Sequence, residues 1–188
     1  MINKIETKNL LLRKARYDDL ESIWNNVWKD ETLASTMLWR VTDNINDAKG
    51  RLERTIKYQS KNYSYFICLK EKDEPIGFIG FIKKKMDVYE DYGLCIARKY
   101  QKNGYGKEAL GAILNVVFEN LNGKKFTYSL FSTNENSRKV CLAFGFKYFE
   151  SRELTREHDN KKFLVDYYYL DKDMYEKEKK RPKIIKNI

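Results

Sequence analysis

Apolar residues recur along this chain with two spacings, which predict a mixture of helices and strands. Spacings of three and four residues predict amphipathic helices at 16–28, 45–60, 106–121 and 134–144. Short apolar runs predict strands at 10–12, 63–69, 76–82, 89–96, 126–131, 146–154 and 163–170. The early strands follow one another, whereas the middle of the chain alternates strand, helix and strand. We therefore expect one mixed sheet in an α/β (α+β) domain.

Length and composition are typical of one folded domain. The chain has 188 residues, of which 42% are hydrophobic and 14% aromatic, enough to bury a core. No repeat or linker divides it. We expect residues 1–175 to form a single domain and the Lys-rich stretch 176–188 to be a loose basic tail.

The net charge of +10 raises the question of a polyanionic partner. The lysines are spread along the chain, which indicates a solvated surface and argues against a dedicated nucleic-acid partner. The polar N-terminus argues against a signal peptide, and the absence of a long apolar run argues against a membrane span. We expect a cytoplasmic protein that is a monomer or a homodimer.

Metal and disulfide chemistry find little support in the sequence. Cys68, Cys95 and Cys141 are isolated and odd in number, and His158 is the single histidine. No spacing matches a zinc site or a disulfide framework. Each cysteine stands in an apolar run, so we expect all three to be buried and no metal to be bound.

The most informative segment is the glycine-bearing turn 101–107. It follows the apolar run 92–96 and leads into the predicted helix from 106 onward. The first N–H groups of a helix have no partner within it, and the helix dipole favours negative charge there. Two glycines, Gly104 and Gly106, allow close approach of the backbone. This arrangement predicts a phosphate site.

Three other interpretations of this turn are disfavoured by its surroundings. The dinucleotide fingerprint GxGxx(G/A) fits at Gly104, but residues 97–103 separate it from the strand, and no acidic residue follows at 126–131. A Walker A loop requires Ser or Thr after Lys107, where Glu108 stands. A turn without a ligand would leave the start of the helix uncapped.

Six motifs stand in a fixed order along the chain and include this turn. They are Thr7-Lys8-Asn9-Leu10-Leu11-Leu12-Arg13 with Asp18-Asp19, Ile76-Gly77, Tyr92-Gly93-Leu94-Cys95-Ile96, the turn as (Arg/Gln)-x-x-Gly-x-(Gly/Ala), Asn134-Glu135-Asn136-Ser137 with Gly145-Phe146, and Asp166-Tyr167-Tyr168-Tyr169-Leu170. With them the chain resembles the GNAT acetyltransferase superfamily over residues 7–175, in the branch of ribosomal-protein N-terminal (RimJ/RimL-like) acetyltransferases. The resemblance implies a GNAT-like mixed, mostly antiparallel twisted sheet of about six or seven strands flanked by helices. It also implies that this sheet is splayed between the strands at 92–96 and 126–131.

The resemblance further implies acetyl-CoA as co-substrate. In such proteins the backbone of the turn, here Gln101, Lys102, Asn103, Gly104, Tyr105 and Gly106, holds the CoA pyrophosphate, and the side chains of Lys102 and Lys107 could add charge. The pantetheine arm pairs with the strand near Cys95 and Ile96, like an added strand. Asn134 and Ser137 stand where the thioester end lies.

The implied reaction is direct transfer, in which a neutral amine attacks the thioester and CoA thiolate leaves. The amine must lose a proton, for which we favour Asp91 as base, with Glu90 second. Strand alternation lets only one of the two face the cleft, and both could be solvated strand-end charges. Many relatives carry a Tyr where this chain has Cys141, so Ser137 is our candidate donor to the thiolate. Tyr148 and Tyr128 are weaker candidates.

The acceptor pocket is expected between the first two helices and the final hairpin. Met37, Leu38 and Trp39 are its candidate lining residues, joined by Trp28 and Tyr58 unless these two serve helix packing. The leading hypothesis is an acetyl-CoA-dependent N-acetyltransferase acting on a protein N-terminus, a small amine such as a polyamine, or an amine antibiotic. The alternative is a catalytically silent CoA-binding or regulatory module of the same fold.

Overall fold

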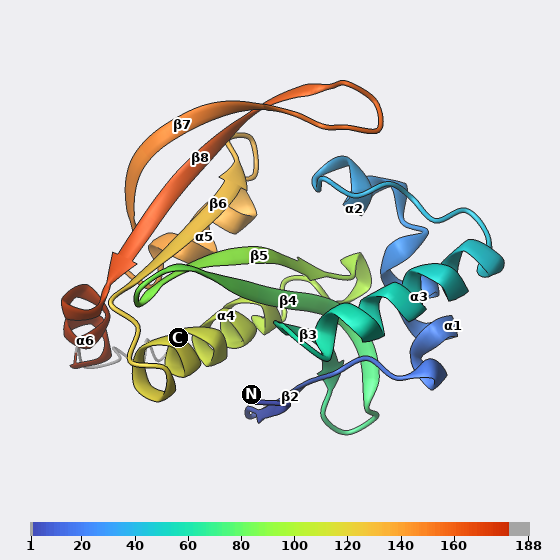
Figure 1. Cartoon of the computed structure of the whole chain (residues 1–188), viewed down its shortest axis with the longest axis horizontal. Coiled ribbons are helices and arrows are strands. Elements are labelled where there is room, and N and C mark those ends of the chain that lie inside the picture. Colours follow the sequence, from blue (N-terminus) through green and yellow to red (C-terminus); the bar gives the residue numbers. More distant parts are fainter. Residues whose placement is uncertain (1, 181–188) are drawn as a thin grey trace, which may run out of the picture.

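The computed structural model describes residues 2–180, which form one sheet with helices on both faces (Figure 1). The strands are β1 (Lys4–Glu6), β2 (Leu10–Arg13), β3 (Tyr63–Leu69), β4 (Glu74–Lys85), β5 (Val88–Ile96), β6 (Lys125–Phe131), β7 (Lys147–Thr155) and β8 (Lys162–Asp171). The α-helices are α1 (Leu20–Ile23), α2 (Glu31–Ser35), α3 (Ile45–Gln59), α4 (Tyr105–Asn115), α5 (Glu135–Leu142) and α6 (Lys172–Lys180). Shorter helical turns are η1 (Tyr17–Asp19), η2 (Trp24–Trp28), η3 (Arg98–Tyr100) and η4 (Val116–Asn120).

The sheet has the strand order β1-β2-β3-β4-β5-β6-β8-β7. Its neighbours are antiparallel except for β5 and β6, which run parallel because α4 connects them. The mixed, mostly antiparallel sheet is therefore confirmed. It has eight strands within the described residues rather than six or seven, because the polar N-terminal segment contributes β1, whose Ile5 pairs with Leu12.

Alternation along the central strands gives the sheet two apolar faces. On one face, Tyr65 and Ile67 join the core beneath α4, η4 and α5. On the other, Phe66 and Cys68 pack with α1, η2, α2 and α3. All three cysteines are buried, as expected. Both faces of β3–β5 are therefore covered by helices, which fixes the position of the central strands.

The sheet opens where β5 and β6 diverge. Their pairing covers three positions, from Val88↔Lys125 to Glu90↔Thr127. Beyond Glu90, β5 remains paired with β4, while β6 continues with β8 as far as Phe131↔Val165. Figure 1 shows β6, β8 and β7 rising away from β5 as an arm whose far end faces α2. The splayed sheet implied by the resemblance is thus present.

Two helices differ from the sequence prediction at their ends. The helix expected from 106 begins at Tyr105 and changes to a π-helical turn at Val116. The tail expected from 176 begins inside α6, whose Tyr175 ring stacks on Phe118 at 4.6 Å between centroids. The rest of that tail, 181–188, lies outside the described residues.

Gly77 is the position on β4 where a larger residue should be least tolerated. A Cβ there would lie 2.0 Å from the carbonyl oxygen of Cys95 on β5. We predict that Gly77→Ala lowers the free energy of unfolding by at least about 2 kcal/mol, because the two strands must move apart. Thermal and denaturant unfolding measure this loss.

Gly50 supplies the matched control for that substitution. It lies inside α3, where an added Cβ would meet only Arg54 Nη1, at 3.4 Å. Gly50→Ala should raise the free energy of unfolding by about 0.5–1 kcal/mol, since Ala loses less backbone entropy in a helix. Equal effects of the two substitutions would contradict the steric account of Gly77.

Candidate active site

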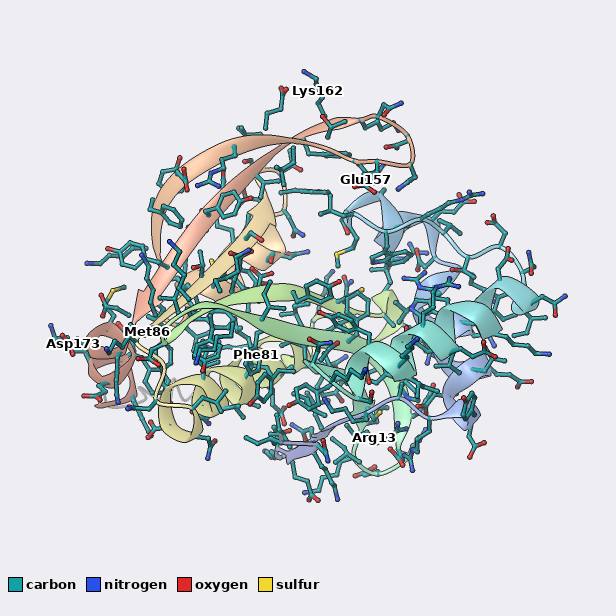
Figure 2. All side chains as sticks on the ribbon, in the orientation of Figure 1. Arg13, Phe81, Met86, Glu157, Lys162 and Asp173 are labelled. Atoms are coloured by element: carbon teal, nitrogen blue, oxygen red, sulfur yellow. The ribbon has the colours of Figure 1, made fainter. Side chains whose placement is uncertain are left out.

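The opening between β5 and β6 leads into a cavity of about 730 Å³. Its wall comes from β5, β6, α3, the start of α5, the segment 36–39 and the β7–β8 hairpin. Figure 2 shows side chains occupying the space between the diverging ribbons, with Glu157 marking the end of the hairpin that faces α2. The splay of the sheet therefore creates a chamber bordered by both of its halves.

Asp91 lies at the point where β5 and β6 stop pairing. Its Oδ1 accepts hydrogen bonds from the Ser129 N–H at 2.8 Å and the Ser129 hydroxyl at 3.1 Å, and the Gly93 N–H approaches Oδ2 at 3.4 Å. The side chain borders the cavity and is half-buried. Burial raises the pKa of this carboxyl to about 7, against the opposing effect of the Ser129 and Gly93 donors. Asp91 is thus a carboxyl whose charge changes near neutral pH.

A β-bulge follows Asp91 directly. Phe81 pairs with Asp91 and Ile79 with Leu94, so Gly80 alone faces two residues, Tyr92 and Gly93. Gly93 has a φ of +97°, a conformation that favours glycine. A bulge leaves backbone groups unpaired and redirects the strand. The stretch 92–94 can therefore present a backbone N–H to the cavity.

Glu90 also borders the cavity, so strand alternation does not remove it from the site. Its carboxylate lies 3.6 Å from Lys84 Nζ. Asp91 instead accepts hydrogen bonds from Ser129 and, within the described residues, forms no salt bridge with a cation. Of the two candidate bases, Asp91 is the one whose environment favours proton exchange.

The start of α5 brings Asn134, Ser137 and Tyr128 together. The Asn134 side chain caps the helix by accepting the Ser137 N–H at 3.1 Å. The Ser137 hydroxyl lies 2.9 Å from the Tyr128 hydroxyl, and all three residues border the cavity. Burial raises the pKa of the Tyr128 phenol, which therefore keeps its proton.

Two other side chains considered as acids lie elsewhere. Cys141 is fully buried in the core, as expected, and its Sγ donates to the Arg138 carbonyl at 3.3 Å. Tyr148 is 54% exposed and its hydroxyl lies 2.9 Å from that of Ser151. Tyr148 is not among the residues that border the cavity.

The glycine-bearing turn joins η3 to α4 and lies apart from the cavity wall. Gly104 has a φ of +80° and precedes α4 without a side-chain cap, so the first N–H groups of the helix are left for a ligand or solvent. Lys102, Asn103 and Lys107 are exposed. The exposed turn with its uncapped helix fits an anion such as pyrophosphate.

Two of the turn residues have roles that the sequence did not indicate. The Gln101 side chain donates to the Ile96 carbonyl at 2.9 Å, so it ties the turn to the end of β5. At Gly106 an added Cβ would meet only Ile96 Cγ1, at 3.8 Å, whereas Gly104 is required for its φ. Of the two glycines, the conformation of the turn depends on Gly104.

Glu108, in the first turn of α4, anchors this turn to the N-terminal strands. Its carboxylate accepts the Thr7 hydroxyl at 2.6 Å, the Asn9 N–H at 2.7 Å and the Asn9 side-chain amide at 2.8 Å. These donors lower the pKa of Glu108 against the effect of burial. The start of α4 is thereby fixed against the β1–β2 turn.

The expected acceptor residues Met37, Leu38 and Trp39 all border the cavity, as do Trp28 and Tyr58. Tyr58 of α3 stacks on Tyr92 of β5 at 5.1 Å between ring centroids. This stack closes one side of the chamber with aromatic surface.

Arg156, at the end of β7, holds the segment with Met37 in place. It is 6% exposed, and its Nη1 donates to the carbonyls of Ala34, Ser35 and Met37 at 3.2, 3.4 and 3.1 Å. Asp159 pairs with its other nitrogens at 2.6 and 3.0 Å. Arg156, Ser129 and the Tyr128–Ser137 contact were missed because they join elements distant in sequence.

The described residues contain no group of three or more His, Cys, Asp or Glu side chains arranged to hold a metal ion. Within the same range, no helix is both long and apolar enough to cross a membrane.

A family profile described as "Acetyltransferase (GNAT) domain" matches residues 9–147, so the chain belongs to the GNAT acetyltransferase family, as the motifs predicted. It is similar to the uncharacterized N-acetyltransferase YnaD of Bacillus subtilis (strain 168), at 24% identity over 146 residues, 76% of this chain and 82% of YnaD.

Solved structures share the fold at low sequence identity. A GNAT-family acetyltransferase from Bacillus anthracis superposes with a TM-score of 0.78 at 20% identity, covering 90% of this chain and 99% of the other. RimL, a ribosomal-protein alpha-N-acetyltransferase in complex with coenzyme A, superposes with a TM-score of 0.76 at 17% identity, covering 92% and 99%.

Replacing Asp91 by Asn tests the role of its carboxyl. The amide keeps an oxygen for the Ser129 N–H but cannot accept a proton. We predict that wild-type kcat/KM falls as pH drops below about 7, where Asp91 becomes protonated, and that Asp91→Asn lowers kcat at least about 100-fold and removes this limb. The dissociation constant for acetyl-CoA should stay within about twofold. An unchanged pH–rate profile would show that another group is the base.

The raised pKa of Asp91 also makes the free energy of unfolding depend on pH. Its pKa in the folded protein is about 7 against 3.8 for an ordinary Asp, so the folded protein holds a proton that the unfolded chain releases between these values. The contribution of Asp91 to the free energy of unfolding therefore decreases as pH rises from about 4 to 7. Denaturant unfolding across this range should show a smaller decrease for Asp91→Asn, whatever the variant does to activity.

Proposed function

We propose that this protein transfers the acetyl group of acetyl-CoA directly to a primary amine, within a complex that holds both substrates. The observation that carries the proposal is the position of Asp91, a carboxyl with a raised pKa at the base of a chamber bordered by both halves of the splayed sheet. One side of this chamber meets the thioester end of the donor, and the other meets the acceptor.

The donor is assigned to the opening and the adjoining turn. The N–H groups at the start of α4, after Gly104, bind the pyrophosphate, and Lys102 and Lys107 add positive charge. The pantetheine arm of CoA pairs with the edge of β5 near Cys95 and Ile96, where β6 no longer pairs with β5. RimL, which shares this fold, was solved with coenzyme A, and this supports the same ligand here.

The chemistry requires three groups. Asp91 takes the proton of the ammonium group, directly or through a water molecule, and leaves a neutral amine that attacks the thioester carbonyl. A backbone N–H of the bulged stretch 92–94 stabilises the oxyanion. When the C–S bond breaks, the attacking nitrogen loses its second proton to the leaving thiolate or to solvent, and the Ser137 hydroxyl donates a hydrogen bond to the thiolate. The phenol of Tyr128, whose hydroxyl contacts that of Ser137, supports this donor.

A catalytically silent CoA-binding module is the second candidate. The observation in its favour is Cys141, which stands where many relatives have a Tyr acid and is fully buried in the core. Release of CoA from acetyl-CoA, measured with a panel of primary amines, separates the two. Binding of acetyl-CoA without release across the panel would favour the silent module.

The glycines of the turn test the assignment of the pyrophosphate. Gly104→Val forces a β-branched residue into a φ of +80°, so we predict that the affinity for acetyl-CoA falls about tenfold or more. Gly106→Ala has room for its Cβ and should change the affinity less than about threefold. Titration calorimetry with acetyl-CoA gives both values. Equal affinities for the two variants would place the phosphates elsewhere.

The leaving-group role of Ser137 is tested by single-turnover rates. Ser137→Ala should slow acetyl transfer about 10- to 100-fold with little change in acetyl-CoA affinity, because its donor acts on the departing thiolate. Tyr128→Phe should have a smaller effect, since the Ser137 hydroxyl remains. A full single-turnover rate in Ser137→Ala would remove Ser137 from the mechanism and leave the contact of its hydroxyl with Tyr128 as its role.

A further inference from the structure

The acceptor side of the cavity contains two arginines that the mechanism does not use. Arg51, Arg54, Thr55 and Tyr58 of α3 follow a spacing that places them on one helix face, and all four border the cavity. Arg51 is half-buried, and Arg54 is exposed at the rim. One helix face thus presents two positive charges to the chamber.

Arg51 is held by aromatic and polar contacts and not by a carboxylate. Its guanidinium carbon lies 4.6 Å from the Trp28 ring centroid and 4.7 Å from that of Trp39. Its Nη1 donates to the Thr42 hydroxyl at 2.9 Å and to the Arg40 carbonyl at 3.4 Å. The two rings fix the guanidinium plane, since arginine stacks well on aromatic faces.

The remaining donors of Arg51, Nε and Nη2, have no protein acceptor among the described residues. These two nitrogens are also accessible. Among the described residues only Trp39 Nε1 is a side-chain polar atom that is both fully buried and without a hydrogen-bond partner, so the unpartnered nitrogens of Arg51 are not fully buried. Burial, together with the charge of Arg54, lowers the pKa of Arg51 to about 10. A half-buried charge without an anionic partner is costly, so a site of this kind favours a ligand that supplies one.

The acidic residues of the cavity do not neutralise these arginines. Arg51, Arg54, Glu90 and Asp91 are the four charged residues in its wall. Glu90 is paired with Lys84 at 3.6 Å. The Asp91 carboxylate accepts hydrogen bonds from the Ser129 N–H and hydroxyl. The positive charge on α3 is therefore free for a ligand.

The phosphates of the donor are not candidates for this anion. Residues 101–107, to which we assign the pyrophosphate, contribute nothing to the cavity wall that holds Arg51 and Arg54. The arginines share that wall with Met37, Leu38 and Trp39, the acceptor side. The anionic group must then belong to the acceptor.

We infer that the acceptor is a primary amine that also carries a carboxylate, which Arg51 and Arg54 bind while the amine lies at Asp91. Guanidinium groups match carboxylates with paired N–H donors, and the aromatic stack prepares one of them. An acidic peptide N-terminus and a free amino acid both have this chemistry. Polyamines, and amine antibiotics without a carboxylate, do not. The inference rests on the proposed acetyl transfer, and the experiment below separates the two.

The test measures binding first, with the protein saturated with CoA. The probes are pentapeptide amides that begin with Ala and carry either Asp or Asn at the second position, and the amino acid alanine with its amide, alaninamide. By titration calorimetry the wild-type protein should bind the acidic member of one pair about tenfold more tightly. The pair that shows the preference identifies a peptide or an amino acid as the source of the carboxylate.

Substitutions in α3 test which residues cause the preference for the acidic probe. Arg54→Gln should reduce it to about threefold or less, and Arg51→Lys should reduce it while keeping the charge, because Lys cannot donate in a paired geometry. Lys57→Gln is the matched control, an exposed residue of the same helix that does not border the cavity, and should keep the full preference. Thermal unfolding checks that each variant is folded.

The possible outcomes decide the inference. Equal binding of both members of each pair, or binding of neither, would overturn it. An equal loss of the preference for the acidic probe in Lys57→Gln would show that the preference comes from the overall positive charge of the protein and not from the two arginines. Weaker CoA binding in Arg54→Gln would assign that arginine to the donor site. An acidic probe that binds preferentially but never releases CoA from acetyl-CoA would leave the anion site standing and reject the proposed transfer.

Discussion

The hydrogen bonds from Ser129 to the Asp91 carboxylate are the interaction on which this site depends. They lie at the position where the backbone hydrogen bonds between β5 and β6 end, so at that point the Asp91 side chain connects the two strands instead. Two consequences follow. The two halves of the sheet stay joined at the base of the opening, and the carboxyl that joins them is enclosed enough for its pKa to rise to about 7.

The two sides of the opening are held in place by separate long-range contacts. Glu108 fixes the start of α4 to the β1–β2 turn through Thr7 and Asn9. Arg156 fixes the end of the β7–β8 hairpin to the carbonyls of the segment that leads to Met37. Because these two tethers share no residue, the glycine-bearing turn and the wall that contains Met37 can vary independently on one scaffold.

Local pattern predicted most of the fold. Most strands and the longer helices were predictable because apolar period and glycine position depend on neighbouring residues. β1 was missed because its three residues carry no apolar pattern and depend on pairing with β2. The tail boundary was placed too early because α6 is polar along most of its length and packs through Tyr175.

The site was predictable only where its residues lie close together in the sequence. The glycine turn and Asp91 stand in recognisable motifs. The Asp91–Ser129, Tyr128–Ser137 and Arg156–Met37 contacts join residues 38, 9 and 119 positions apart, and only the folded chain brings them together. The arginines of α3 were not singled out, since charged residues on a helix are most often solvated.

The measurement that tests the account most directly is a crystal structure with bound acetyl-CoA or a stable thioether analogue. The account predicts the pyrophosphate at the N–H groups after Gly104 and the pantetheine arm along β5 beyond Glu90. It also predicts the acyl carbon within reach of both the Asp91 carboxyl and the Ser137 hydroxyl. A ligand bound outside the β5–β6 opening, or an acyl group on the far side of β5 from Asp91, would contradict it.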